Sequence, residues 1–337
     1  MSNTINRQIR LAARPVGLPK DSDWKLVEEP VGDPGPGEML VKIHYISVDP
    51  AMRGWMNDNP SYVPPVQIDA VMRALTVGEV VASNNDRFAT GDFVAGIEGV
   101  QNYAFSDGSE LTKVDTNLAP LHSYLNTLGI AGLTAYCGLI EVGQVKKGDT
   151  VLVSGAAGSV GAHVGQIAKI KGCRAVGIAG GPEKCAYLTN ELGFDAAIDY
   201  KAESVVDGLR RTCPDGIDVF FDNVGGEILD EALARINVGA RVVICGAISQ
   251  YNNTTPIQGP SNYLSLLIRS SRMQGFVYFD FREQWPVMMK ELAGWLAEGK
   301  IKSRDDIVEC DVDIYPQVLL RLFRGDNFGK LMIKLPS

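Results

Sequence analysis

Hydrophobic and polar positions follow two different patterns along the chain. Over roughly the first 120 residues, short runs rich in valine and isoleucine are separated by clusters of glycine, proline, asparagine and aspartate, as in strands joined by turns. The strands that these runs predict are Trp24–Val31, Met39–Val48, Leu75–Ser83 and Asp92–Ile97. Short strands at this close spacing predict a compact barrel or sandwich.

From about Leu125 onward, apolar strands alternate with helices. Helices are predicted at Leu125–Val142, Val160–Lys171, Pro182–Leu192, Glu203–Arg211, Glu227–Ile236, Tyr263–Ser270 and Glu283–Leu296. The predicted strands are Asp149–Ser154, Arg174–Ile178, Ala196–Asp199, Ile217–Phe221, Ala240–Cys245 and Met273–Tyr278. Because continuous apolar strands separated by helices are buried on both faces, this alternation predicts a parallel, doubly wound sheet.

The two patterns together predict an α/β chain of two domains. Residues 1–122 form the β-rich domain, and residues 300–337 return to it, since Gly329–Lys334 alternates like a strand. Residues 123–299 form the doubly wound domain. A length of 337 residues agrees with two domains of about 150 residues each.

Charge and composition argue against several classes of function. A net charge of −8 and a pI near 5.1 argue against nucleic-acid binding, because an acidic protein has no general attraction for a polyanion. No run approaches the roughly 18 apolar residues of a membrane span, and no signal peptide is seen, so we expect no membrane association and a cytoplasmic location. Six scattered cysteines and three histidines lack metal-ligand spacing, so we expect reduced thiols and no metal site.

The strongest local motif follows the first predicted strand of the second domain. It reads GAAGSVG at residues 155–161 and opens a helix. Glycines at these positions allow a tight turn and let backbone N–H groups approach a pyrophosphate at the helix N-terminus. The motif therefore predicts a dinucleotide-binding site.

The end of the second strand indicates which dinucleotide is bound. NAD sites usually place an aspartate or glutamate there for the ribose 2′-hydroxyl. Here residues 178–181 read IAGG, without an acid, and Lys184 follows within reach of a 2′-phosphate. This favours NADP(H), although Lys184 could also be an ordinary solvated lysine in a first helical turn.

The turn around Ser159 is also similar to the nucleophile elbow of hydrolases. A hydrolase triad of that type needs a histidine later in the chain. No histidine follows His163, which lies one helical turn from Ser159, so the hydrolase interpretation fails. His163 itself lies on an apolar helix and is expected to be a core residue.

Several motifs in a fixed order give the chain a family resemblance over nearly its whole length. They are VDPAMR (48–53), GLTAY (132–136), AAGSVG (156–161), DNVGG (222–226), CGAISQY (245–251) and GDNFGK (325–330). With them the chain resembles the zinc-free medium-chain dehydrogenase/reductase superfamily, and within it the prostaglandin reductase, leukotriene hydroxydehydrogenase and plant alkenal double-bond reductase group. The resemblance implies a GroES-like β-barrel catalytic domain, a Rossmann domain, an active site in the cleft between them, and a homodimer.

Matched position by position, the resemblance implies a full set of NADP(H) contacts. Those to the pyrophosphate would be Gly158, Ser159, Val160 and Gly161; those to the 2′-phosphate and riboses would be Lys184, Tyr200 and Asn223. The loop over the nicotinamide half would comprise Cys245, Gly246, Ala247, Ile248, Ser249 and Tyr251, with backbone contacts from Phe276, Val277 and Tyr278 and further contacts from Thr134 and Asn327. Asn223 could instead cap a helix, and Phe276–Tyr278 could be only a buried strand.

The resemblance also implies an activity, the NADPH-dependent reduction of the carbon–carbon double bond of α,β-unsaturated aldehydes or ketones. Hydride would reach the β-carbon, and Tyr251 would donate a hydrogen bond to the developing enolate. The proton for the α-carbon would come from Tyr251 or from water. The implied substrate-binding residues are Ala51, Met52 and Tyr62. Relatives often carry tyrosine where this chain has Ala51, so its pocket volume should differ, and Tyr62 could equally be a structural loop aromatic.

Two other functions are compatible with the same cofactor. The first is NADPH-dependent quinone reduction on a zinc-free relative of this fold, and the second is a non-catalytic NADPH-binding protein. A tyrosine suited to an enolate, in loop 245–251, favours the enone reductase over the quinone reductase. The complete set of cofactor positions together with Tyr251 argues against a non-catalytic protein.

Overall fold

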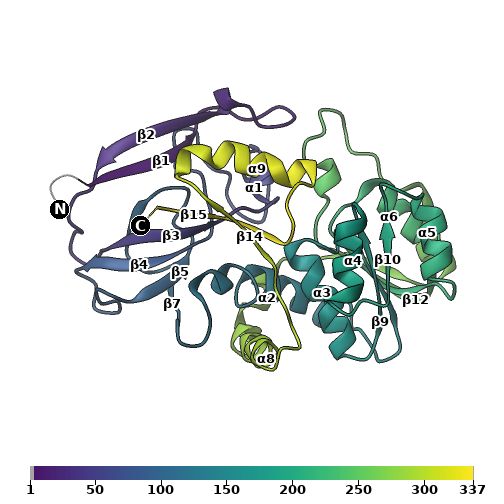
Figure 1. Cartoon of the computed structure of the whole chain (residues 1–337). Coiled ribbons are helices and arrows are strands. Elements are labelled where there is room, and N and C mark those ends of the chain that lie inside the picture. Colours follow the sequence, from purple (N-terminus) through teal and green to yellow (C-terminus); the bar gives the residue numbers. More distant parts are fainter. Residues whose placement is uncertain (1–3, 337) are drawn as a thin grey trace. The chain divides into compact units, whose positions relative to one another are not determined.

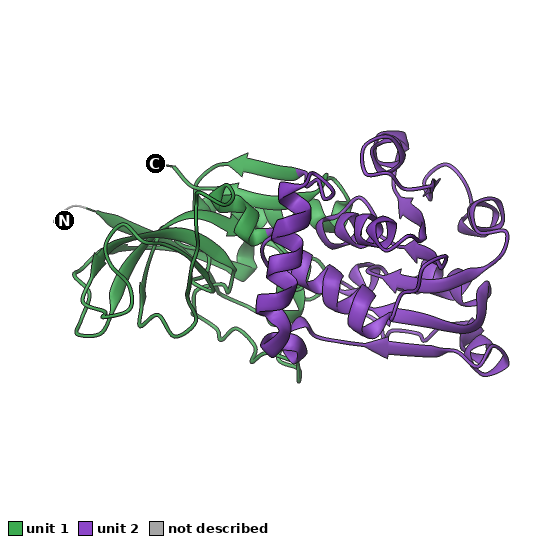
Figure 2. Cartoon of the chain, turned by 90° about the horizontal axis from the view of Figure 1, so that it is seen from below, with its two compact units in different colours: residues 1–125, 305–337 green, residues 126–304 purple. Residues whose placement is uncertain are grey.

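The computed structural model describes residues 4–336, and the chain divides into two compact units (Figure 2). Unit 1 comprises residues 1–125 and 305–337, and unit 2 comprises residues 126–304. The boundaries therefore fall a few residues after the positions 122 and 299 that the sequence pattern suggested.

Unit 1 is built mainly from antiparallel strands. β1 (Ile5–Leu11) and β2 (Trp24–Pro30) pair with each other, and a second sheet has seven strands in the order β14-β15-β3-β4-β5-β7, with β6 paired to β3. These seven are β3 (Met39–Ser47), β4 (Thr76–Ser83), β5 (Phe93–Gly96), β6 (Tyr103–Ser106), β7 (Thr112–Lys113), β14 (Asp305–Glu309) and β15 (Lys330–Lys334). The tail strand β15 pairs antiparallel with β3 (Figure 1), so the C-terminal segment returns to the N-terminal unit as expected.

The helices of unit 1 are short apart from α9. They are α1 (Met52–Trp55) and α9 (Tyr315–Arg324), with 3-10 turns η1 (Asp21–Asp23), η2 (Leu121–Leu125) and η7 (Val312–Ile314). Buried residues of α9 recur at Tyr315, Val318, Leu319 and Leu322, which is the spacing of one helical face. That face packs into the core of unit 1, and α9 ends at Gly325, whose φ of 70° suits a left-handed C-cap.

Unit 2 contains a six-stranded parallel sheet in the order β10-β9-β8-β11-β12-β13. The strands are β8 (Thr150–Val153), β9 (Arg174–Ala179), β10 (Ala196–Asp199), β11 (Ile217–Asp222), β12 (Ile236–Ile244) and β13 (Arg272–Gly275). Numbered within the unit, this order is 3-2-1-4-5-6, which is that of dinucleotide-binding domains. Because strand order reverses beside β8, a ligand is expected at the carboxyl ends of β8 and its neighbours.

Helices alternate with these strands as the sequence predicts. They are α2 (Ile130–Tyr136), α3 (Ser159–Ile170), α4 (Pro182–Asn190), α5 (Val205–Thr212), α6 (Gly226–Leu233), α7 (Leu264–Ile268) and α8 (Trp285–Ala297). Shorter elements are the π-helical η3 (Cys137–Val142) and the 3-10 turns η4 (Ile248–Gln250), η5 (Ser261–Tyr263) and η6 (Tyr278–Gln284). The core under the sheet is formed by central apolar strand residues, among them Leu152, Val176, Ile198, Phe220 and Val242.

Several predicted elements of unit 2 differ from the structure; the strand predicted at Ala240–Cys245, for example, is β12 and begins at Ile236. The helix predicted at Leu125–Val142 begins only at Ile130 and continues as a π-helix from Cys137. The helix predicted to reach Ile236 ends at Leu233, because Ile236 is buried as the first residue of β12. The strand predicted at Met273–Tyr278 covers Arg272–Gly275, and Tyr278 opens η6 instead. Within residues 4–336, no helix is long and apolar enough to cross a membrane.

Candidate active site

The glycine-rich turn joins β8 to α3 and is held tightly against the sheet. Gly155 has a φ of 58°, and a Cβ atom on Gly161 would lie 2.5 Å from the Gly155 carbonyl oxygen, so only glycine fits. The Ala156 amide donates to the Ile178 carbonyl of β9 at 3.0 Å. Ala162 makes the first helical hydrogen bond, to the Gly158 carbonyl at 3.0 Å. The amides before it belong to the open helix end, which is suited to an anion.

Side-chain contacts fix the first turn of α3. The Ser159 hydroxyl donates to Asn126 Oδ1 at 2.7 Å. His163, which is 1% exposed, lies 2.7 Å through Nδ1 from the Ser159 carbonyl and 2.8 Å through Nε2 from the Thr127 hydroxyl. Since a carbonyl only accepts, Nδ1 carries the proton and Nε2 accepts from Thr127. His163 is therefore a buried structural residue, as the sequence indicated, and it orients the turn.

Tyr200 and Lys184 flank the glycine pair at the end of β9. Gly181 has a φ of 98°, and a Cβ atom on Gly180 would lie 2.8 Å from the Tyr200 hydroxyl oxygen, so the tyrosine side chain lies directly over Gly180. Lys184 is the third residue of α4, in its first turn. Strand β9 ends at Ala179 without an acidic side chain. This leaves the position of a ribose-binding acid vacant and places a cation in the adjoining helix turn.

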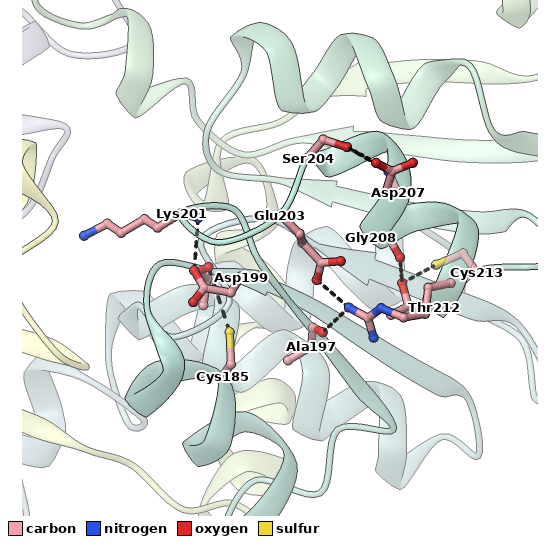
Figure 3. A network of polar contacts seen from close by, with 12 residues as sticks. Cys185, Ala197, Asp199, Lys201, Glu203, Ser204, Asp207, Gly208, Thr212 and Cys213 are labelled. Atoms are coloured by element: carbon pink, nitrogen blue, oxygen red, sulfur yellow. Dashed lines mark hydrogen bonds and ion pairs between the residues drawn. The ribbon is translucent and has the colours of Figure 1, made fainter.

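An acid does lie nearby, but it comes from β10 and is engaged with the backbone (Figure 3). Asp199 Oδ1 accepts hydrogen bonds from the amides of Gly181 at 2.8 Å and Lys201 at 3.0 Å. Arg211 stabilises the segment after β10, because its guanidinium binds Glu203 and the Ala197 carbonyl. Asp199 therefore holds the turns that carry Tyr200 and Gly181.

Asp222, at the end of β11, organises the middle of the sheet's carboxyl edge. It is 0% exposed, and its Oδ1 accepts from the Ser154 hydroxyl at 2.6 Å and the Val224 amide at 3.0 Å. The Gly225 amide donates to the same carboxylate. Burial raises the pKa of Asp222, whereas these hydrogen bonds oppose that rise. Sequence reasoning missed this role; its only signal was an acid directly after an apolar strand.

Asn223, the residue after Asp222 at the end of β11, completes this arrangement. Its side-chain amide donates to the Ser154 carbonyl at 2.7 Å, and its backbone amide donates to the Ser154 hydroxyl at 2.8 Å. Asn223 thereby links the end of β11 to the glycine-rich turn after β8. It is not a simple helix cap, because α6 begins at Gly226 and its N-cap position is Gly225.

The loop after β12 is joined by backbone hydrogen bonds to the segment after β11. The amides of Cys245 and Gly246 donate to the Asp222 carbonyl at 2.9 and 3.1 Å. The Ile248 amide donates to the Asn223 carbonyl at 3.2 Å, and the Ser249 hydroxyl donates to the Val224 carbonyl at 2.6 Å. Burial raises the pKa of Cys245 to about 12, so this side chain is a neutral thiol at neutral pH.

Tyr251 folds back over its own loop. Its hydroxyl oxygen accepts a hydrogen bond from the Ala247 amide at 3.2 Å. A Cβ atom on Gly246 would lie 2.9 Å from the same oxygen, so a glycine is required for this close approach. The phenol is consequently fixed at the carboxyl end of β12, in the loop that also binds the end of β11.

The segment after β13 lies beside aromatic neighbours. The Phe276 ring meets Phe221 edge-on, with ring centroids 6.3 Å apart. Tyr278 stacks on Trp285 at 5.2 Å, and the Trp285 indole N–H donates to the Tyr278 carbonyl at 3.1 Å. Phe276, Val277 and Tyr278 are thus half-buried connecting residues rather than part of a strand. Thr134 is a half-buried residue of α2.

The remaining predicted residues belong to unit 1. Ala51 is half-buried at the start of α1, and Met52 is fully buried, with its sulfur 3.3 Å from the Tyr315 hydroxyl. Tyr62 is 52% exposed and accepts from the Trp55 indole at 3.1 Å, in a segment (58–65) that lines a cavity of about 420 Å³. Asn327 lies between α9 and β15, where its side chain donates to the Gly329 carbonyl at 3.0 Å.

No cluster of three or more histidine, cysteine, aspartate or glutamate side chains suited to a metal ion was found in residues 4–336. The sheet order and the glycine-rich turn define a dinucleotide-binding protein. Comparisons with known proteins then specify the family.

Two family models match the chain: the N-terminal domain of oxidoreductase at residues 7–114, and zinc-binding dehydrogenase at residues 159–294. YfmJ of Bacillus subtilis, named as an NADP-dependent oxidoreductase, is 47% identical over 98% of this chain and 97% of its own length. The NADPH-dependent curcumin reductase of Escherichia coli is 42% identical, with the same coverage. The crystal structure of CurA from Vibrio vulnificus in complex with NADPH has a TM-score of 0.93 at 42% identity, over 98% of this chain and 99% of that one.

The chain belongs to the zinc-free medium-chain dehydrogenase/reductase family, and like the two relatives named above it is an NADP-dependent oxidoreductase. The predicted combination of a GroES-like domain and a Rossmann domain is confirmed by the similarity to the solved structure.

Proposed function

We propose that this protein reduces the carbon–carbon double bond of α,β-unsaturated aldehydes and ketones with NADPH. The observation that carries the proposal is the fixed position of the Tyr251 phenol, which the Ala247 amide holds at the carboxyl edge of a nucleotide-binding sheet. The similarity to a protein named as an NADPH-dependent curcumin reductase supports the same reaction type.

The residues at this edge fit NADPH. The open amides of Ser159, Val160 and Gly161 suit the pyrophosphate, and Gly161 has no room for a side chain that would fill the cradle. Lys184 and Tyr200 suit the 2′-phosphate and its ribose, since no acid stands at the end of β9. When bound, NADPH supplies a hydride to the β-carbon of the substrate.

Residues that follow β11, β12 and β13 would hold much of the rest of the cofactor. Asn223 is the candidate contact for a ribose, and residues 245–249 form the loop over the nicotinamide half. Phe276, Val277 and Tyr278 would offer backbone groups to the carboxamide, and Thr134 and Asn327 would add polar contacts. These assignments follow the family motifs.

Tyr251 would act on the substrate carbonyl. As the double bond is reduced, negative charge moves to the carbonyl oxygen, where a hydrogen-bond donor stabilises it. A phenol that accepts from the Ala247 amide is a stronger donor through its own O–H, because hydrogen bonds in a chain polarise one another. Tyr251 is therefore assigned as the donor to the enolate oxygen.

Ala51 and Tyr62 are assigned as substrate-binding residues of unit 1. The small Ala51 side chain leaves volume that a bulky aromatic enone would fill, and Tyr62 offers a hydroxyl for a distal polar group. Met52 is buried behind them and would act by supporting the turn.

The test of this function is NADPH oxidation by the purified protein against a panel of electrophiles. The panel sets straight-chain 2-alkenals, alkenones and a diarylheptanoid dienone beside quinones and saturated ketones, with NADH in parallel. Consumption with the enones, yielding saturated carbonyl products, is expected. Turnover of quinones alone would make the protein a quinone reductase, and tight NADPH binding with no turnover would make it a non-catalytic binder.

The same protein is proposed to be a homodimer that associates through the edge of its parallel sheet. Among the described residues, strand β13 pairs with β12 alone, and all four of its residues are exposed. Exposed apolar side chains occur on β13 and on two elements near it, namely α7, which precedes β13 in the chain, and β12, its neighbour in the sheet. They are Leu264 (52% exposed), Leu267 (77%) and Ile268 (75%) of α7, Val238 (73%) of β12 and Met273 (39%) of β13. An edge strand with exposed apolar neighbours is a ready site for pairing with a second copy.

Light scattering coupled to size-exclusion chromatography tests this assembly. Leu267→Glu combined with Met273→Glu is expected to convert a dimer into a monomer by placing charges in the apolar contact. Leu118→Glu, at a 56% exposed position in unit 1, is the matched control and should leave the mass unchanged. A wild-type monomer would refute the assembly without bearing on the reductase activity.

A further inference from the structure

A buried lysine lies beneath the turn that begins α1 in unit 1. Lys330 is 1% exposed, and its Nζ lies 2.5 Å from both the Ser47 hydroxyl oxygen and Asp49 Oδ1. The Ser47 hydroxyl also donates to the other oxygen of Asp49, which closes a three-residue cluster. Lys330 and Asp49 are 281 positions apart in the chain, so the contact ties the C-terminal strand to the N-terminal β-domain.

The cluster supports the turn from Asp49 to Arg53. The Met52 amide donates to the Asp49 carbonyl at 3.1 Å, and the Val48 amide donates to the Leu331 carbonyl at 3.1 Å. The turn that carries Ala51 thus rests on β15 through Lys330 and through the main chain.

Two further contacts show that the turn is fixed on several sides. Tyr315 of α9 donates to the Met52 sulfur at 3.3 Å, and burial together with the Asp49 charge raises the pKa of its phenol. Arg53, 3% exposed, donates to the carbonyls of Pro15 and Gly17 at 3.0 Å.

A buried ion pair is not needed simply to hold two strands together. Apolar side chains of similar volume serve that purpose at least as well, because taking charges out of water is costly. A hydrogen-bonded ion pair adds directionality, because it fixes the position of the donor atom relative to the acceptor atom. The pair Lys334–Glu309, which joins the same strand β15 to β14, is by contrast at the surface, with side chains 41% and 73% exposed.

Lys330 also ends the segment that carries Asn327. Between them, the Phe328 amide donates to the Asp306 carboxylate at 3.0 Å, and Asn327 donates to the Gly329 carbonyl. Residues 327–330 therefore include both a proposed cofactor contact, Asn327, and Lys330, which holds the turn that carries Ala51.

We propose that Lys330 is a positioning residue for substrate binding. Its hydrogen bonds to Asp49 and Ser47 fix the position of the turn that carries Ala51. This inference rests on the proposed function, in which Ala51 lines the substrate site.

The test compares two charge-neutral double variants. Asp49→Asn/Lys330→Met removes the buried pair without leaving one charge uncompensated, whereas Glu309→Gln/Lys334→Met removes the exposed pair of the same strand as a control. For the first variant we expect the KM for the enone to rise about tenfold, with kcat and NADPH affinity changed less than about twofold. We also expect faster amide hydrogen exchange in residues 49–55. The control should match the wild type in every readout.

A wild-type KM and wild-type exchange in the folded Asp49→Asn/Lys330→Met protein would overturn the inference. If that variant does not fold, Ser47→Ala decides, because it removes one partner and leaves both charges in contact: a KM raised about threefold supports the inference, and an unchanged KM refutes it. Should the wild type reduce no enone, the proposed function fails, and the exchange of residues 49–55 alone then decides whether Lys330 positions the turn.

Discussion

Two parts of the carboxyl edge of the parallel sheet are built in opposite ways. Around β8, β11 and β12, the polar groups are buried and bonded to one another, with Asp222 at the centre. Around β9 and β10, the groups that would meet the adenosine end lie at the surface, and Tyr200 is 46% exposed. On the proposed assignments, we infer that the inner part fixes the geometry of the reaction site, whereas the outer part selects the cofactor.

The largest effect is expected from Asp222→Ala. The Ser154 hydroxyl and the amides of Val224 and Gly225 would lose their shared acceptor, which should lower the free energy of unfolding by about 3 kcal/mol. Urea denaturation followed by tryptophan fluorescence measures it. Asp222→Asn keeps one acceptor oxygen and should cost about half as much. Wild-type stability in both variants would show that this edge of the sheet does not depend on the Asp222 carboxylate.

Tyr251→Phe should be the next largest in effect and should act on turnover alone. Loss of a donor to a developing oxyanion is expected to lower kcat about a hundredfold. NADPH affinity, measured by fluorescence titration, should remain within about twofold, because the ring and its loop are kept. Unchanged turnover would move the donor to another residue.

Gly161→Ala should weaken NADPH binding about tenfold by displacing the glycine-rich turn. The added methyl group would meet the Gly155 carbonyl oxygen at 2.5 Å and Ala156 Cα at 2.8 Å, neither of which can move freely. Gly294→Ala, in α8 with open space around its Cβ, is the matched control and should leave binding unchanged. Wild-type affinity in Gly161→Ala would refute the close approach in the turn.

Lys184→Ala should have the narrowest effect, because it should change the affinity for one cofactor only. Removing a charge-assisted contact to the 2′-phosphate is expected to lower the affinity for NADPH about tenfold and to leave the affinity for NADH unchanged. Lys290→Ala, an exposed lysine of α8, serves as the control. An equal loss of affinity for NADPH and NADH would show that Lys184 does not recognise the 2′-phosphate and that the outer part of the edge does not select the cofactor by charge.

Much of the fold could be predicted because the parallel strands are continuous apolar runs. β8 and β10 agree with their predicted ranges to within a residue at each end; β8 is a buried central strand, and β10 is a short apolar run between turns. β13 was placed too late because it is a short, exposed edge strand with no apolar run of its own. Helix α9 was missed, although its buried spacing and the cap at Gly325 were present as signals.

The candidate site could be predicted only where glycine or a family motif marks it. The turn at 155–161 carries a local signature, because its geometry requires residues without side chains. Asp222 and Lys330 carry no such signature, because an aspartate at the end of a strand and a lysine at the start of one are common. What distinguishes them is burial and partners brought from other strands, and a single sequence does not record those.

The most direct test of the central claim is the fate of deuterium from NADPH labelled at nicotinamide C4, with an enone as substrate. Both stereoisomers of the labelled cofactor are used, and the product is analysed by NMR and mass spectrometry. The account predicts that one of them delivers deuterium to the β-carbon of a saturated aldehyde or ketone. Deuterium on the former carbonyl carbon of an allylic alcohol, with the double bond intact, would contradict it.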